Sequence, residues 1–214
     1  MRSFSYNELE QATDGFKEEL GKGSFGVVYK GAMSGGNKTI AVKRLEKFVK
    51  EGHREFRAEI RAIARTHHRN LVQLLGFCFE GSRKLLVYEY MSNGSLADFL
   101  FKAKMRPIWK ERVRIARDVA RGILYLHDEC EVNIIHCNIK PQNILMDDTW
   151  TAKISDFGLA KLLLPNQSRT FVDAEGTTTG CFYLAPERKK NARISVKADT
   201  YSFGIVLLEI HYKN

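Results

Sequence analysis

The sequence lacks the features that mark several classes of protein. Its four cysteines are irregularly spaced and form no C-x-x-C pair, so we expect reduced thiols rather than a disulfide framework or a zinc site. Proline occurs only 4 times in 214 residues, which leaves no proline-rich linker. No apolar run approaches the roughly 18 residues of a membrane-spanning helix, and residues 1–10 show no apolar stretch typical of a signal peptide. We therefore expect a cytoplasmic globular chain.

The composition is that of a folded protein with an excess of positive charge. Hydrophobic residues make up 44% of the chain, and 34 Lys and Arg against 25 Asp and Glu give a formal net charge of +9. Such an excess occurs in proteins that bind nucleic acids or anionic membranes, but basic residues also cover exposed helix faces. The basic residues that cluster most closely are Lys102, Lys104, Arg106, Lys110, Arg112, Arg114, Arg117 and Arg121. No stacking aromatics accompany them at a nucleic-acid motif spacing, so we expect no nucleic-acid partner.

Hydrophobic periodicity predicts strands early in the chain and helices later. Ser5 and Glu8 have the spacing of a capping box and predict a short helix that ends near Asp14-Gly15. The predicted strands are Val27–Tyr29, Ile40–Val42, Leu71–Phe79, Lys84–Tyr90, Ile144–Met146 and Lys153–Ser155. The other predicted helices are Phe48–Thr66, Ser95–Phe101, Trp109–His127 and Val196–Ile210. This order predicts an α+β protein of two lobes, with a hinge near Glu89–Asn93.

Two of the predicted helices carry wide apolar faces. Val196–Ile210 is apolar nearly all round, which indicates a buried helix. The predicted apolar face of the helix Trp109–His127 consists of Val113, Ile115, Ala116, Val119, Ala120, Ile123 and Leu124. Residues 161–186 have no clear period and are expected to form an irregular loop.

A G-x-G-x-x-G motif occupies residues 21–26. It consists of Gly21, Lys22, Gly23, Ser24, Phe25 and Gly26. Glycines let backbone amides approach phosphate groups closely. In dinucleotide-binding folds a strand precedes such glycines and a helix opens at them. Here they run into the strand-like Val27–Tyr29, which favours a glycine-rich hairpin over ATP. An ordinary glycine turn is the alternative for this motif alone.

Two acidic residues and a lysine extend this motif towards phosphate chemistry. Lys43 lies on the next predicted strand, from which it can reach the α- and β-phosphates. Glu59 follows 16 residues later on a predicted helix, where it can hold Lys43 as an ion pair. Asp156, in the sequence Asp-Phe-Gly, can bind Mg²⁺ through its carboxylate.

Three further motifs complete the series. The segment His136–Asn143 supplies Asn143 as an oxygen ligand for a second Mg²⁺ and Lys140 as a cation near the γ-phosphate. The sequences Ala185–Glu187 and Asp199–Gly204 follow in that order.

This series resembles the protein kinases. The phrases FSYNELEQATDGFKEELGKGSFGVVYKG, LLVYEYMSNGSLADFLF, IIHCNIKPQNIL, ISDFGLAKLL and DTYSFGIVLLEI narrow the resemblance to plant receptor-like serine/threonine kinases of the G-type lectin (S-domain) group. It covers residues 4 to about 210. It implies a bilobal kinase fold with a flanking segment at 1–15, an N-lobe at 16–90 and a partial C-lobe at 91–214. Lys140 favours a serine/threonine rather than a tyrosine kinase in the family pattern.

The resemblance also implies ATP and Mg²⁺ as cofactors and assigns roles in binding them. Tyr88 is the gatekeeper, and the backbone of Glu89 and Met91 offers hydrogen bonds to adenine. The adenine ring would lie between Val28, Ala41 and Leu145, and the metal ligands would be Asn143 and Asp156. The implied partners are ATP and a protein substrate or signalling partner. A membrane is implied only through a parent receptor, on the cytosolic face of the plasma membrane.

Position 138 departs from the family pattern. The family has Asp there, which accepts the proton of the substrate hydroxyl, whereas this chain has Asn138. An amide is not basic near neutral pH, and general-base catalysis typically contributes about 10²–10⁴-fold to a rate. Asn138 can still orient a hydroxyl, and nucleotide binding does not use it. We therefore expect ATP binding with much reduced phosphoryl transfer.

The end of the chain is a second departure. In complete kinases, by the same resemblance, further residues cover the helix Val196–Ile210 and supply an arginine that pairs with Glu187. This chain ends at Asn214, so we expect a C-lobe truncated after its central helix, uncovered apolar side chains and low stability or dependence on a partner.

Three functions are therefore weighed. The first is a working serine/threonine kinase that uses Lys43, Glu59, Lys140, Asn143 and Asp156. The second is a pseudokinase-type module that holds a nucleotide, or only the fold, and acts through partners; Asn138 favours it. The third, nucleic-acid binding, rests on the basic charge alone.

Overall fold

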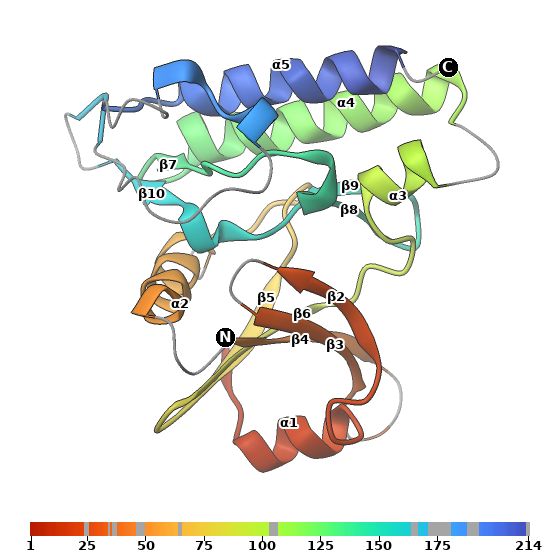
Figure 1. The fold of residues 1–214 in the computed structure, drawn as a ribbon, viewed down its shortest axis with the longest axis vertical. Helices are drawn as coiled ribbons and strands as arrows, with labels where there is room; N and C mark the ends of the chain where they lie inside the picture. The colour runs from red at the N-terminus through yellow and green to blue at the C-terminus, as the bar shows by residue number, and fades with distance from the viewer. Residues whose placement is uncertain are drawn as a thin grey trace.

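The fold was analysed in a computed structural model of the chain. It describes residues 1–23, 26–33, 35, 38–45, 50–63, 66–102, 107–163, 167–170, 181–187 and 193–212, with the side chains at 23, 50–55 and 181 left aside. A strand-rich lobe lies below a helical lobe in Figure 1. This arrangement confirms the predicted α+β class and the two lobes.

A six-stranded sheet forms the lower lobe, with the strand order β1-β5-β6-β4-β3-β2. The strands are β1 (Arg2–Ser3), β2 (Glu19–Gly23), β3 (Gly26–Ala32), β4 (Thr39–Leu45), β5 (Leu74–Glu80) and β6 (Arg83–Glu89). All neighbours are antiparallel except the pair of β1 and β5. The four predicted strands of this region lie in β3, β4, β5 and β6, although β5 begins at Leu74 rather than Leu71.

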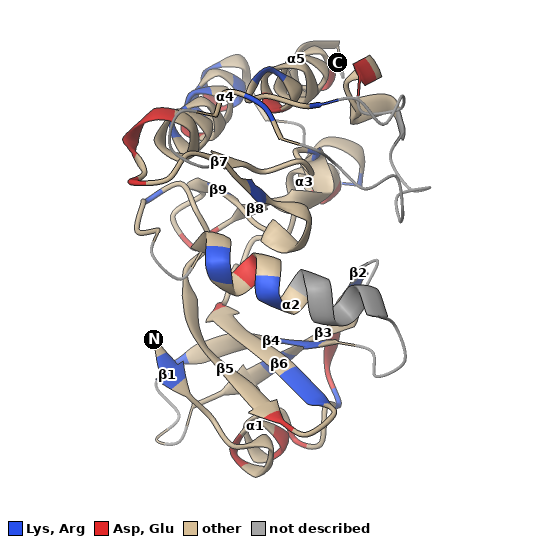
Figure 2. Cartoon of the chain, turned by 90° about the vertical axis from the view of Figure 1, so that its left-hand side faces the viewer, with Lys and Arg blue, Asp and Glu red and all other residues tan. Residues whose placement is uncertain are grey.

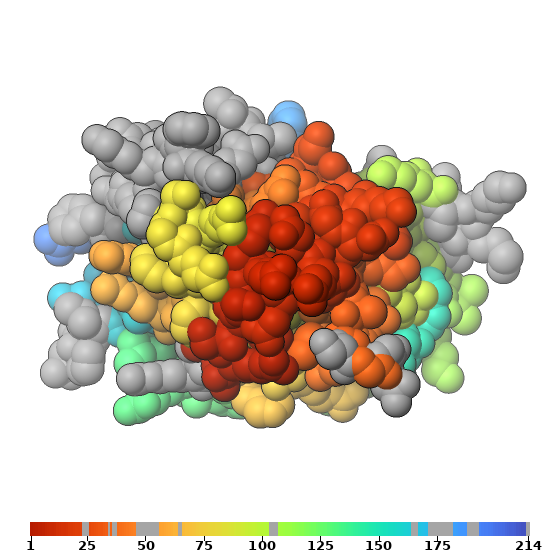
Figure 3. All heavy atoms as spheres, turned by 90° about the horizontal axis from the view of Figure 1, so that it is seen from below, coloured from red at the N-terminus to blue at the C-terminus, as the bar shows by residue number. Residues whose placement is uncertain are grey.

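The first sixteen residues pack on the outer face of this sheet. Helix α1 (Tyr6–Ala12) begins with the predicted capping box, in which Ser5 Oγ accepts a bond from the Glu8 amide at 3.1 Å and the Glu8 carboxylate accepts one from the Ser5 amide at 2.7 Å. A separate core cluster joins this segment to the sheet, and its buried members are Phe4, Leu9, Phe16, Tyr29, Ile40, Val42, Cys78, Leu85 and Val87. Figure 3 looks onto this end, where N-terminal residues (red) cover the centre. The segment expected to flank the lobe thus adds a strand and a helix to it.

Helix α2 (Lys50–Ile63) lies against the other face of the sheet and reaches the helical lobe. Its predicted apolar stripe is confirmed at Phe56 and Ile63, which are buried, and at Ile60, which is half-buried; Ala64 lies outside the described residues. The helix also contacts the 3₁₀ turn Phe157–Leu159. Because Glu59 is on the buried side of α2, this packing aims it towards Asp156.

In the upper lobe, the residues that the structure describes form three α-helices and two short strand pairs. The helices are α3 (Leu96–Phe101), α4 (Trp109–Leu124, continued by a π-helical turn at Tyr125–Glu129) and α5 (Lys197–Tyr212). The strand pairs are β7 (Ile134–Ile135) with β10 (Lys161–Leu162), and β8 (Ile144–Met146) with β9 (Ala152–Ile154). Helices α4 and α5 lie side by side at the far end of the lobe (Figure 1). Within the predicted irregular loop, the described residues form β10 and a 3₁₀ turn at Cys181–Tyr183.

The predicted apolar face of α4 is only partly buried, and α5 is buried on one side. On α4, Ile115, Val119 and Ile123 are buried as predicted, but Val113, Ala120 and Leu124 are exposed. Helix α5 packs only one face against the lobe, so it is not buried all round, and the expectation of uncovered apolar side chains is confirmed. Its exposed residues include Tyr201, Leu207, Leu208 and Tyr212. Apolar character permits burial, but the elements packed around a helix decide which side is covered.

The largest core cluster runs through both lobes. It joins Phe56 and Leu86 below to Ile115, Ile139 and Phe157 above. Lys and Arg residues are spread over elements of both lobes, from β1 to α4 (Figure 2). Within the part of the chain that the structure describes, no helix is both long and apolar enough to cross a bilayer.

Candidate functional site

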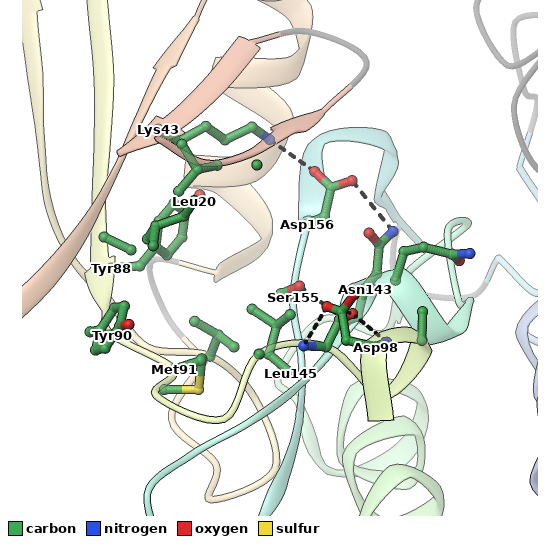
Figure 4. A pocket seen from close by; sticks show the side chains of 18 of the residues that line it. Leu20, Lys43, Tyr88, Tyr90, Met91, Asp98, Asn143, Leu145, Ser155 and Asp156 are labelled. Carbon is green, nitrogen blue, oxygen red and sulfur yellow. Dashed lines mark hydrogen bonds and ion pairs between the residues drawn. The ribbon is translucent and has the colours of Figure 1, made fainter. Parts of the chain in front are cut away.

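A cavity of about 680 Å³ lies between the sheet and the helical lobe. This volume is within the usual range for small-molecule sites, about 300–1,000 Å³. In Figure 4, where the sheet is drawn at the top, the walls come from β2, β3 and β4 above, from β6 and the segment after it at the left, and from α3, β8 and the residues after β9 below. Parts distant in sequence thus surround one space.

The glycine-rich hairpin forms the roof of the cavity. In the pairing of β2 with β3, Gly21 lies opposite Val28 and Gly23 opposite Gly26. A Cβ on Gly26 would meet the Arg44 carbonyl oxygen at 2.3 Å, whereas one on Gly21 would meet nothing within 4 Å. The glycine at 26 is therefore required by the close approach of β4, and the glycine at 21 leaves open space beside the cavity.

Apolar side chains line the end of the cavity nearest the connection between the lobes. Val28 and Ala41 come from the sheet, Leu145 from β8 in the other lobe, and Met91 from the segment that joins the lobes. Because apolar side chains come from both the sheet and β8, an aromatic ring placed between them would gain dispersion contacts on both sides.

Glu89, the last residue of β6, is clamped from two sides. Lys153 Nζ donates to both carboxylate oxygens of Glu89 at 2.9 Å. The Gln73 amide donates to the same carboxylate at 2.8 Å, and the Glu89 amide donates to the Gln73 carbonyl at 3.1 Å. Because Lys153 lies on β9, this clamp ties the connection between the lobes to the floor of the cavity.

Lys43, Glu59, Asp156 and Tyr88 form a hydrogen-bonded cluster at the inner end of the cavity. Lys43 Nζ lies 3.2 Å from Glu59 Oε2 and 2.8 Å from Asp156 Oδ1. Tyr88 donates its hydroxyl proton to Glu59 Oε1. The side chains of Lys43 and Glu59 are 7% and 1% exposed, whereas that of Asp156 is 29% exposed. Asp156 is thus more exposed to the cavity than Lys43 or Glu59.

Burial and charge act in opposite directions on the two carboxyl groups. Burial raises the pKa of Glu59. The positive charge of Lys43 lowers it and the negative charge of Asp156 raises it further, so the pKa of Glu59 lies above its usual value. Burial is the largest influence on Asp156 and opposes its ionisation, but the charge and hydrogen bond of Lys43, together with the charges of His136 and Lys140, hold the pKa of Asp156 below its usual value. Burial raises the pKa of Tyr88 as well, so its hydroxyl keeps the proton that it donates.

Asn138 and Asn143 meet Asp156 from the other side. Asn138 Nδ2 donates to Asp156 Oδ2 at 2.8 Å. Asn143 Nδ2 donates to the Asn138 carbonyl at 2.9 Å and lies 3.4 Å from Asp156 Oδ2. Lys140 is half-buried and close enough for its charge to lower the pKa of Asp156. Both carboxylate oxygens of Asp156 are therefore bonded to protein donors.

This combination of a glycine hairpin, a Lys–Glu pair and an acidic residue on the opposite wall is the arrangement of a protein kinase cleft. The sequence profile described as protein tyrosine and serine/threonine kinase matches residues 15–214. The chain belongs to this protein kinase family.

Curated relatives are similar to this kinase chain over nearly its whole length. It is 56% identical over 211 residues to the G-type lectin S-receptor-like serine/threonine-protein kinase LECRK4 of Oryza sativa subsp. indica, covering 98% of this chain and 26% of that protein. It is 52% identical over 213 residues to RLK1 of Arabidopsis thaliana, a protein of the same description, covering 98% of this chain and 25% of that protein. The chain thus spans about a quarter of the length of these relatives, and the resemblance stated from the sequence is confirmed.

The loop that carries Asn138 in this kinase is held by Asp199, at the start of α5. Asp199 accepts bonds from the His136 amide at 2.7 Å and the Cys137 amide at 2.8 Å, and it lies 2.9 Å from His127 Nε2. These bonds hold Cys137 at a φ of 66°, a left-handed conformation that is costly for a residue other than glycine. The sequence places Asp199 in a motif but predicts no role for it.

The structure brings most of the predicted site residues together. Those that line the cavity are Gly21, Lys22, Val28, Ala41, Lys43, Glu59, Glu89, Met91, Asn143, Leu145 and Asp156. Asn138 bonds to Asp156 from beside the cavity, and Gly23 and Gly26 form the end of the hairpin. Ser24 and Phe25 lie outside the described residues.

Several lining residues were missed by the sequence analysis. Leu20, Ser95, Asp98 and Ser155 also border the cavity. Leu20 directly precedes the glycine motif, so its position in the roof of the cavity could have been predicted from the sequence. Ser95 and Asp98 have capping-box spacing, and they form that box at the start of α3. Their contact with the cavity depends on how the lobes meet.

The residues present fit a magnesium ion together with nucleotide phosphates. Mg²⁺ is usually held by one or two protein oxygens plus phosphate oxygens. The ionised carboxylate of Asp156 faces the cavity, and because Asn143 Nδ2 is engaged, its Oδ1 is the atom that would face a cation. The hard oxygen donors suit Mg²⁺ rather than a softer metal.

Proposed function

We propose that this chain binds ATP with Mg²⁺ in the cleft and transfers its γ-phosphoryl group to serine or threonine hydroxyls, at a rate reduced by Asn138. The observation that carries the proposal is the buried Lys43–Glu59 pair, which contacts Asp156 at the inner end of the cavity. Such a pair and an acidic metal ligand must both be in place for kinase chemistry. The names of the relatives as serine/threonine kinases support the choice of acceptor.

Each residue then has a role that follows from its position. Val28, Ala41 and Leu145 would enclose the adenine ring, and the backbone at Glu89 and Met91 would bond to its edge. The hairpin from Gly21 to Gly26 would cover the phosphates. Lys43 would bind the α- and β-phosphates while Glu59 and Tyr88 keep it in place.

The remaining polar residues act on the transferred group. Asn143 and Asp156 would hold Mg²⁺, which when bound offsets the negative charge of the phosphates. In the transfer step, the bond between the γ-phosphorus and the β-phosphate oxygen breaks and the acceptor oxygen bonds to that phosphorus. Lys140 would neutralise negative charge on the γ-phosphoryl group during this step. Asn138 can orient the acceptor hydroxyl but cannot take its proton, which is then lost to phosphate or water.

A second candidate is a pseudokinase-type module that binds nucleotide and acts through partners. The bond from Asn138 to Asp156 favours it, since the amide is turned towards the metal ligand rather than towards an acceptor. In either case the chain would work on the cytosolic face of the plasma membrane if its parent is a receptor, as the relatives' names indicate.

Phosphoryl transfer from labelled ATP separates the two candidates. We expect the wild-type chain to label itself or a general serine/threonine substrate slowly, and Asn138→Asp to do so about 10²–10⁴-fold faster. Lys43→Met gives the background. Wild-type labelling equal to that background would reject the kinase, and a wild-type rate unaffected by Asn138→Asp would reject the role given to Asn138.

A further inference from the structure

Both carboxylate oxygens of Asp156 already accept hydrogen bonds from the protein. Lys43 donates to Oδ1 at 2.8 Å and Asn138 Nδ2 donates to Oδ2 at 2.8 Å. Because a carboxylate only accepts hydrogen bonds, this contact fixes which way the Asn138 amide faces. Asn143 adds a longer contact of 3.4 Å to Oδ2. The negative charge of Asp156 is therefore partly balanced by protein donors before any cation binds.

An aspartate at 138 would make the opposite interaction. Its carboxylate would lie about 3 Å from that of Asp156, and like charges at this distance cannot both remain ionised unless a cation lies between them. Asparagine has nearly the same shape, removes that charge and supplies a donor instead. The need for a divalent cation at Asp156 is thereby reduced.

The charges around the cavity point the same way. Glu59 is bonded to Lys43 and Tyr88 and is only 1% exposed, so Asp156 is the carboxylate of this cluster that meets a bound anion. Lys22 and Lys43 line the cavity, and Lys140 acts on Asp156 from close by. These cations can offset phosphate charge without a metal ion.

We propose that Asn138 makes nucleotide binding by this chain largely independent of Mg²⁺. The inference rests on the proposed nucleotide site but not on phosphoryl transfer. Asn138 acts here as a positioning residue, because it holds Asp156 and keeps a second carboxylate away from the phosphates. Transfer itself would still require the metal.

The test is titration of the whole chain with a fluorescent ATP derivative in Mg²⁺ and in EDTA. For the wild type we expect the two dissociation constants to agree within about threefold, a small difference in binding free energy. For Asn138→Asp we expect the affinity for the nucleotide in EDTA to weaken by about tenfold or more and to recover in Mg²⁺. The added negative charge repels the phosphates, and a partly buried site screens this repulsion only weakly. Asn133→Asp makes the same change at an exposed position and should behave like the wild type.

Each outcome has a distinct meaning. Loss of wild-type binding by more than about tenfold in EDTA would overturn the inference while leaving the proposed function intact. An Asn138→Asp variant with no greater metal dependence than the wild type would also overturn it. Absence of wild-type binding in both buffers would reject the proposed nucleotide site and the inference with it. The wild-type comparison remains decisive if a variant fails to fold.

Discussion

At the scale of single residues, the cluster around Glu59 shows what a sequence motif predicts and what it omits. The pairing of Lys43 with Glu59 followed from their order along the chain and from the predicted helix that carries Glu59. The bond from Tyr88 to Glu59 did not, because the two are 29 residues apart and no local pattern links them. The same holds for the bond from Asn138 to Asp156, since the sequence placed Asn138 towards the acceptor.

Tyr88→Phe tests the second donor to Glu59. The change leaves a buried carboxyl group with one donor fewer, and we expect the free energy of unfolding to fall by about 1–3 kcal/mol. Tyr201→Phe removes the same hydroxyl from an exposed position on α5 and should leave stability unchanged. Urea titration measures both. Equal stability of Tyr88→Phe and the wild type would show that the hydroxyl does not support Glu59.

At the scale of elements, order and type were more predictable than burial. The capping box at Ser5 and the strands β3, β4 and β6 could be predicted because their signals are local. The exposed side of α4, with Val113 and Leu124, could not. Periodicity reports which residues share a face, whereas coverage of that face depends on elements distant in sequence. The place of β1 beside β5 is unpredictable for the same reason.

The clamp between Lys153 and Glu89 gives the element-scale prediction. These side chains are 15% and 22% exposed, so their ion pair is weakly screened by solvent. A double-mutant cycle with Lys153→Met and Glu89→Gln should give a coupling energy of about 1 kcal/mol or more. The matched cycle at Lys17 and Asp14, which are 77% and 81% exposed, should give a value close to zero. Equal coupling in the two cycles would contradict a clamp at the hinge.

At the scale of the whole molecule, a shared core joins two lobes around one cleft. The core cluster passes from the sheet through Phe56 and Phe157 into the helical lobe, so the walls of the cleft are parts of one packed unit. Helix α5 packs one face against this unit and exposes an apolar stripe at Tyr201, Leu208 and Tyr212. Exposed apolar stripes of this kind promote association between molecules.

Leu208→Lys tests the consequence of that stripe. Because Leu208 is 50% exposed, we expect stability to change by no more than about 0.5 kcal/mol, while concentration-dependent association falls. Val206→Lys, two residues away on the buried face of α5, should unfold the chain. Sedimentation velocity and thermal melting measure these effects. Unchanged association in Leu208→Lys would show that the stripe is inert.

The central claim is that the cleft between the lobes binds ATP through Lys43 and its partners. Calorimetric titration of the whole chain with ATP and Mg²⁺, beside Lys43→Ala, tests it most directly. The account predicts saturable binding at one site in the wild type and affinity about tenfold or more weaker in the variant, because a charge-assisted contact to phosphate is lost. No binding by the wild type, or equal affinity in both proteins, would contradict it.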